Sequence, residues 1–149
     1  MTLTTNQKLA IALTAVVAVA AVTVAIFYVV RIRTQGRILT IGIEVYKSAD
    51  LGPKLEFIDW ADISPSESKY VECWVLNTQN TAVTLELLTE NYNPAESQQY
   101  LKTAWDISPE TVLGPQEAIK ANIVLTVSPN AQNVTGFSYD IVIKATKTG

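Results

Sequence analysis

Hydrophobic and polar positions follow two different patterns along this chain of 149 residues, and the change comes near residue 37. Residues 9–30 form an apolar run without a charged side chain, interrupted by the polar Thr14 and Thr23. About 20 such residues span the hydrocarbon core of a bilayer as a helix. Beyond residue 37, apolar and polar positions alternate in short stretches, which is typical of half-buried β-strands. The pattern predicts a hydrophobic helix with basic flanks in 1–37 and a β-domain in 38–149.

The ends of the apolar run have the features of a membrane anchor. Aromatic and basic side chains gather where a helix would leave the bilayer. The predicted anchor residues are Leu9, Val30, Phe27, Tyr28, Arg31 and Arg33. Ala18-Val19-Ala20 resembles a signal-peptide cleavage site, but the apolar run continues for about ten residues beyond it. An uncleaved, single-pass signal anchor in contact with membrane lipid is therefore favoured over a secreted product.

Two observations on the orientation of the anchor point in opposite directions. Lys8 precedes the apolar run, whereas the three arginines Arg31, Arg33 and Arg37 follow it. The larger positive charge on the side of the β-domain favours a cytoplasmic location of that domain. The β-domain is rich in Thr, Asn and Ser, however, and Asn133-Val134-Thr135 is an acceptor sequence for N-glycosylation. We adopt the second interpretation, which predicts a domain outside the cell membrane and Asn133 as a candidate glycosylation site.

The β-domain is predicted to be a single antiparallel sandwich of the immunoglobulin-like type, with about seven strands. Pro, Gly or Asn occurs at nearly every joint between the alternating segments, and no strand–helix–strand alternation is present. The predicted strands are 38–46, 55–60, 69–76, 82–89, 100–107, 118–127 and 137–145.

Several short motifs in the β-domain resemble those of small archaeal surface proteins that carry a hydrophobic N-terminal segment and one immunoglobulin-like domain. The motifs are Ile58-Asp59-Trp60 with Pro65, Asn77, Val83-Thr84-Leu85, 91–94, Trp105-Asp106, Pro115 and 123–127. Thr78-Gln79 departs from the pattern, which has Gly in the turn after Asn77. The resemblance implies a fold and a surface location, and it implies no defined activity.

Composition and charge disfavour several classes of function. Residues 38–149 contain seven lysines and all fourteen acidic residues, a net charge of −7, which disfavours nucleic-acid binding. The sequence has no histidine and one cysteine, Cys73, which alternates with Val71 and Val75 as a buried residue would. Catalytic sites built on histidine are therefore excluded. We predict no enzymatic activity, no cofactor and no identifiable small-molecule substrate.

Tryptophans and clustered carboxylates are the remaining candidates for chemistry. Trp60, Trp74 and Trp105 are expected to fill the core or an interface. The alternative is a sugar-stacking surface, because Trp60 follows Asp59 and Trp105 precedes Asp106. Asp59, Asp62 and Glu56 are expected to be solvated side chains near a turn. Their alternative is a site for Ca²⁺, although the spacing of a calcium-binding loop is missing.

The first predicted strand carries a row of apolar residues and one charge, Glu44. Its candidate edge or donor positions are Ile38, Ile41, Ile43 and Val45. Such a strand either completes the sheet of its own chain or adds to the sheet of a neighbour. Pairing within the same chain is the favoured interpretation.

Three functions remain open. The first is a membrane-anchored module of the cell surface that acts by structure or adhesion. The second is the subunit of a pilus-like filament, built from copies of this chain through the hydrophobic helix or through donated strands. The third is an accessory subunit of a membrane complex, in which a face of small residues (Ala15, Ala18, Ala21 and Ala25) contacts partner helices.

Overall fold

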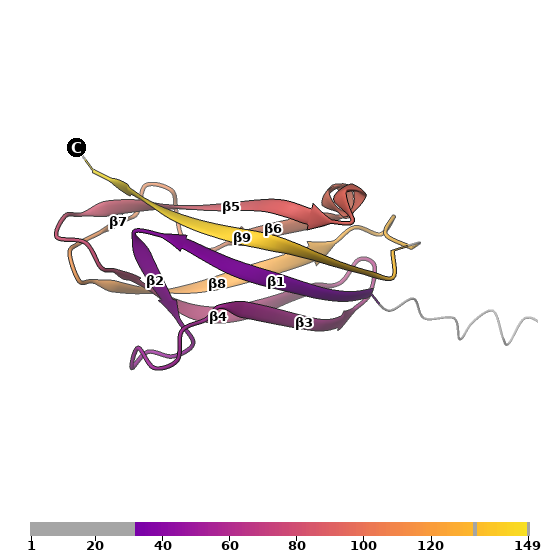
Figure 1. Ribbon diagram of the computed structural model, residues 1–149, viewed down its shortest axis with the longest axis horizontal. Coiled ribbons are helices and arrows are strands. Elements are labelled where there is room, and N and C mark those ends of the chain that lie inside the picture. The colour runs from indigo at the N-terminus through magenta and orange to yellow at the C-terminus, as the bar shows by residue number, and fades with distance from the viewer. Residues whose placement is uncertain (1–31, 133, 149) are drawn as a thin grey trace, which may run out of the picture.

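A computed structural model describes residues 32–132 and 134–148, which fold into two β-sheets (Figure 1). The elements are β1 (Ile32–Ile41), β2 (Ile43–Tyr46), β3 (Phe57–Ile63), β4 (Ser68–Asn77), β5 (Val83–Asn93), the 3-10 helix η1 (Ala95–Tyr100), β6 (Leu101–Trp105), β7 (Val112–Leu113), β8 (Ala118–Val127) and β9 (Gly136–Lys147). One sheet has the strand order β3-β1-β9-β5-β7, and the other has the order β2-β4-β8-β6. The all-β class predicted from the alternating pattern is confirmed.

The core lies between the two sheets and is built from alternate residues of their strands. On β8 the side chains of Ile123, Leu125 and Val127 are fully buried, and on β9 Ile141 and Ile143 are fully buried. Each such side chain contributes about 1.5–3 kcal/mol by leaving water. Because side chains of a strand alternate between its two faces, this core fixes which residues of each strand face outward.

The predicted first strand, 38–46, is two strands in the structure. β1 pairs in the five-stranded sheet and β2 pairs in the four-stranded sheet, and Gly42 alone separates them. Gly42 has φ +76°, a conformation that favours glycine. β1 also begins at Ile32, six residues before the predicted start, so that 32–37 of the predicted basic flank form part of the sheet.

The prediction of a purely antiparallel sandwich was wrong at one strand pair. β1 and β9 are parallel over nine paired positions, from Arg33 opposite Gly136 to Ile41 opposite Lys144. All other strand pairs of the described residues are antiparallel. β1 runs in the same direction as the last strand, β9. After β1 the chain turns at Gly42 and continues as β2 in the four-stranded sheet.

Candidate functional site

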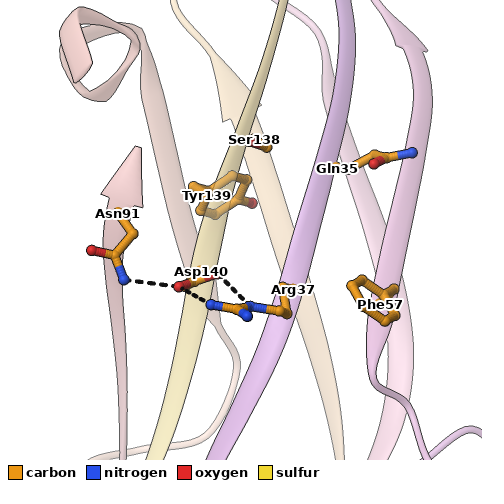
Figure 2. Close-up of a pocket in the computed structure, with 7 residues that line it drawn as sticks. All are labelled: Gln35, Arg37, Phe57, Asn91, Ser138, Tyr139 and Asp140. Atoms are coloured by element: carbon orange, nitrogen blue, oxygen red, sulfur yellow. Dashed lines mark hydrogen bonds and ion pairs between the residues drawn. The ribbon is translucent and has the colours of Figure 1, made fainter. Parts of the chain in front are cut away.

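A hollow with a volume of about 380 Å³ lies on the outer face of the five-stranded sheet. Figure 2 shows the side chains that line it, which come from β1, β3, β5 and β9. They are Gln35, Arg37, Phe57, Asn91, Ser138, Tyr139 and Asp140. Asp140 lies at the centre of the polar contacts in this group, between the strands that carry Arg37 and Asn91.

Asp140 is held by three hydrogen bonds from two neighbouring strands. Arg37 Nε donates to Oδ1 at 2.9 Å, and Arg37 Nη2 donates to Oδ2 at 2.8 Å. Asn91 Nδ2 donates to Oδ2 at 2.9 Å. The Asp140 side chain is 8% exposed, whereas that of Arg37 is 53% exposed. The Arg37 guanidinium, followed by the Asn91 amide, therefore holds the pKa of Asp140 below its usual range, and burial opposes the shift only partly.

This geometry connects strands and leaves little capacity for catalysis. A general acid or base needs a carboxyl group that can exchange a proton near neutral pH. Asp140 is instead held ionised by Arg37, and Asn91 also contacts one of its oxygens. The three residues come from β1, β9 and β5, so their contacts link three adjacent strands of one sheet.

The candidate donor strand is divided between the two sheets. Ile38 and Ile41 lie on β1, which is paired with β3 on one side and with β9 on the other. Ile43 and Val45 lie on β2, an edge strand paired with β4. The outer edge of β2 is partly covered, because Leu55 N donates to Val45 O at 2.8 Å. Ile38, Ile43 and Val45 are buried, whereas Ile41 is exposed.

Most of the predicted anchor residues and the glycosylation site lie outside the described residues. These are Leu9, Phe27, Tyr28, Val30, Arg31 and Asn133. Arg33 lies on β1, opposite Asp62 of β3. Within 32–132 and 134–148, no helix has the length and apolar character needed to cross a membrane.

The tryptophans next to Asp59 and Asp106 occupy core-facing positions. Trp60 lies in the core and is 2% exposed. Trp105 is partly buried and packs against the core cluster. Both rings lie on core-facing positions because they share the alternation of the buried residues around them. Trp74 is half-buried on the outer face of the four-stranded sheet, where Lys120 Nζ lies 5.7 Å from the centre of its ring.

Asp59 on β3 binds the local backbone. Asp59 Oδ1 accepts a hydrogen bond from Ala61 N at 2.9 Å, and Ala61 has φ +53° in a bulge opposite β1. Lys69 Nζ also donates to the Trp60 carbonyl at 3.0 Å, at the free edge of the sheet. The described residues contain no group of three or more His, Cys, Asp or Glu side chains that could hold a metal ion.

The thiol and the buried phenol are both held in their neutral forms. Cys73 is fully buried on β4, and burial raises its pKa to about 12. A nucleophilic cysteine needs a lowered pKa and access to substrate, so this thiol is unsuited to such a role. Burial also raises the pKa of Tyr139 to about 12, although the hydrogen bond between Thr103 Oγ1 and the Tyr139 hydroxyl opposes the shift.

Two polar contact sites were not identified by sequence reasoning. Asn77 is fully buried, and its Nδ2 donates to the carbonyl groups of Thr81, Leu113 and Gly114 at 2.8–3.1 Å. Asp106 accepts from the main-chain N and the Nδ2 of Asn122, at 2.8 and 2.7 Å. The signal for both was weak, since each residue is an ordinary polar side chain at the predicted end of a strand.

No protein-family model matches this chain, and neither does any of the curated proteins compared with it. The resemblance to archaeal surface proteins therefore stays a prediction.

Proposed function

We propose that this chain is a non-enzymatic module of the cell surface, held by a single membrane anchor, that acts by structure or adhesion. The observation that carries the proposal is the pairing of polar side chains in the hollow on the outer face of the five-stranded sheet. Arg37, Asn91 and Asp140 bind one another and thereby connect three strands. The buried thiol and phenol, both with a pKa of about 12, support the same conclusion.

The strand order supports an immunoglobulin-like sandwich. Constant-type immunoglobulin domains have the order A-B-E-D in one sheet, and strands C and F are neighbours in the other. The order β2-β4-β8-β6 corresponds to A-B-E-D, with β5 and β9 as C and F. In this comparison β1 occupies the place of the last strand, G, beside β9, but runs parallel to it.

The connection between the anchor and the domain suits a surface module. The apolar run of 9–30 is followed directly by β1, which is hydrogen-bonded along both edges. Arg37 of β1 adds a bidentate ion pair to Asp140 of β9. A force that pulls the domain away from the membrane would therefore act on the β1–β3 and the β1–β9 hydrogen bonds at the same time.

Membrane association and protease access test the proposal. The full-length protein is expressed in its native cells, and membranes are washed with alkaline carbonate. We expect the protein to stay in the membrane fraction, and a protease added to intact cells to degrade the β-domain. A Val16→Lys/Ala20→Lys variant should be lost from the membrane, since each charge costs about 3 kcal/mol at the centre of a spanning helix.

A Val16→Leu/Ala20→Leu variant is the matched control and should remain bound. Release of the wild-type protein by carbonate would overturn the anchor. Protection of the β-domain from external protease would overturn the surface location and place the domain inside the cell.

A filament subunit is the second candidate, and the position of β1 favours it. A strand that fills the place of the last strand could be exchanged between copies, with the turn at Gly42 as the hinge. Against exchange, Gly42 is the single residue between β1 and β2, and β1 is already paired on both sides. Rods visible by electron microscopy in the purified native protein would favour the filament over the anchored module.

A further inference from the structure

Exposed apolar side chains gather on the outer face of the five-stranded sheet. Among the described residues, five large hydrophobic side chains are strongly exposed, and four of them lie on this face. These four are Ile41, Phe57, Leu88 and Val112, with exposed fractions of 55%, 63%, 44% and 55%. The fifth, Tyr70, lies on the other sheet. Exposed apolar side chains mark an interaction surface where they form a contiguous patch, so their register decides whether these do.

The register of the strands shows how the centre of this face is built. Leu39 of β1 lies opposite Val142 of β9, and Val142 lies opposite Leu88 of β5. These three side chains form an apolar row across three adjacent strands. Val142 is 7% exposed although it points away from the core, because its neighbours in this outer layer cover it. We name Leu39, Val142 and Leu88 the apolar row.

Charged residues flank the apolar row, and the two outer strands differ in sign. Glu86 and Glu90 of β5 flank Leu88, whereas Arg37 of β1 and Lys144 of β9 lie on the other side of the face. Arg37 is half exposed above its contact with Asp140. The face is therefore acidic along β5 and basic at Arg37 of β1, whereas β9 carries one charge of each sign, Asp140 and Lys144.

We propose that this face is the surface on which two copies of the chain pair. A second copy, turned by half a revolution about an axis along β9, lies with its β5 over β1 of the first. Leu88 of each copy then meets Leu39 of the other, and Glu90 meets Arg37. Such a symmetric contact uses the same patch twice, as two-fold interfaces do. The contact between the acidic Glu90 of β5 and the basic Arg37 of β1, made twice by the symmetry, is the reason to favour a copy of the same chain over a lipid surface.

The proposal goes beyond the proposed function, since it requires neither the anchor nor a surface location. Its first test is self-association of the full-length protein in detergent micelles, measured by sedimentation equilibrium. We expect reversible dimers, and we expect Leu88→Lys to weaken them about tenfold or more by placing a charge at the centre of the contact. Tyr70→Lys is the matched control, because Tyr70 is more exposed but lies on the opposite sheet.

The second test addresses the orientation of the copies. Leu39→Cys and Leu88→Cys chains are mixed and oxidised with copper phenanthroline, while the buried Cys73 stays unreactive. We expect a disulfide between the two variants to form faster than one between Leu88→Cys and Tyr70→Cys chains. Equal rates would overturn the two-fold arrangement. A monomeric wild-type protein, or dimers that tolerate Leu88→Lys, would overturn the use of this face.

Discussion

At the scale of single residues, Asp140 shows why a buried carboxylate on an outward-facing position can be tolerated. A buried charge is costly unless hydrogen bonds and an opposite charge compensate for the loss of water. Arg37 supplies both forms of compensation through two hydrogen bonds, and Asn91 adds a third. The same contacts connect β1 with β9 and β5, so the side chain stabilises the packing of the first strand as well as its own charge.

The variant Asp140→Asn tests this role. It keeps the shape of the side chain but removes the charge that Arg37 binds, so we expect the free energy of unfolding to fall by about 1–3 kcal/mol near neutral pH. The pKa of Asp140 is lowered from 3.8 in the folded protein. Its stabilising contribution is thus present above the unfolded value and is lost as the pH falls through the lower, folded value.

Urea unfolding of both proteins in detergent micelles, at neutral pH and in strong acid, measures the difference in the free energy of unfolding. The difference in the free energy of unfolding between wild type and Asp140→Asn should become smaller in acid. Glu110→Gln is the control, because Glu110 is an exposed carboxylate that lies outside the strands. A difference that stays constant with pH would mean that the ionised carboxylate contributes nothing to the stability of the fold.

Asn77 marks the limit of what sequence can predict at this scale. The sequence predicts a strand over 69–76 followed by a polar turn, and β4 ends one residue later, at Asn77. The carbonyl groups that its amide binds belong to Thr81, Leu113 and Gly114, and two of these lie more than thirty residues away. A pattern of local alternation carries no information about such distant partners. The same reason explains why the Arg37–Asp140 pair could not be predicted.

At the scale of elements, strand alternation predicted most of the fold. Seven alternating segments correspond to strands of the structure, because each buries one face against the same core. The short β7 escaped prediction, since two residues are too few to show alternation. Gly42 divides the first predicted segment into β1 and β2. The pattern does not reveal this division, because the division depends on the pairing of β1 with β9 and of β2 with β4.

The start of β1 decides where the β-domain begins, and truncation tests it. We expect a fragment of residues 32–149 to fold cooperatively. We expect the free energy of unfolding of a fragment of 38–149 to be lower by on the order of 3–5 kcal/mol. The shorter fragment lacks the pairing of Arg33 to Arg37 with β9 and the ion pair to Asp140. Each lost hydrogen bond contributes about 1 kcal/mol.

Circular dichroism during thermal and urea unfolding compares the two fragments. An Ile41→Ala variant of the longer fragment is the control, because this exposed residue of β1 makes little contribution to the core. Equal stability of the two fragments would show that the domain begins at residue 38, as the hydrophobic pattern predicts.

At the scale of the whole molecule, the two ends of the described chain lie at opposite ends of the domain. Figure 1 shows the start of β1 at one end and the end of β9 near the other. With an anchor in 9–30, the end that holds the start of β1 would face the membrane. The outer face of the five-stranded sheet would then stand roughly upright and remain accessible to a second copy on the same membrane. Anchoring and pairing are therefore compatible.

The state of the N-terminus in the native protein distinguishes the anchored module from the filament. We expect the intact mass of the protein, isolated from its native membranes, to account for all 149 residues, less at most Met1 and plus any glycan on Asn133. A retained apolar run followed by arginines is the physical reason, since it acts as an anchor rather than a cleaved signal. Loss of about ten residues would instead indicate a filament with a helical core, and loss of about twenty or more would indicate a released protein whose β1 is free to pair with another copy. Enzymatic removal of glycans before the measurement is the control, because it separates an added mass on Asn133 from a change at the N-terminus.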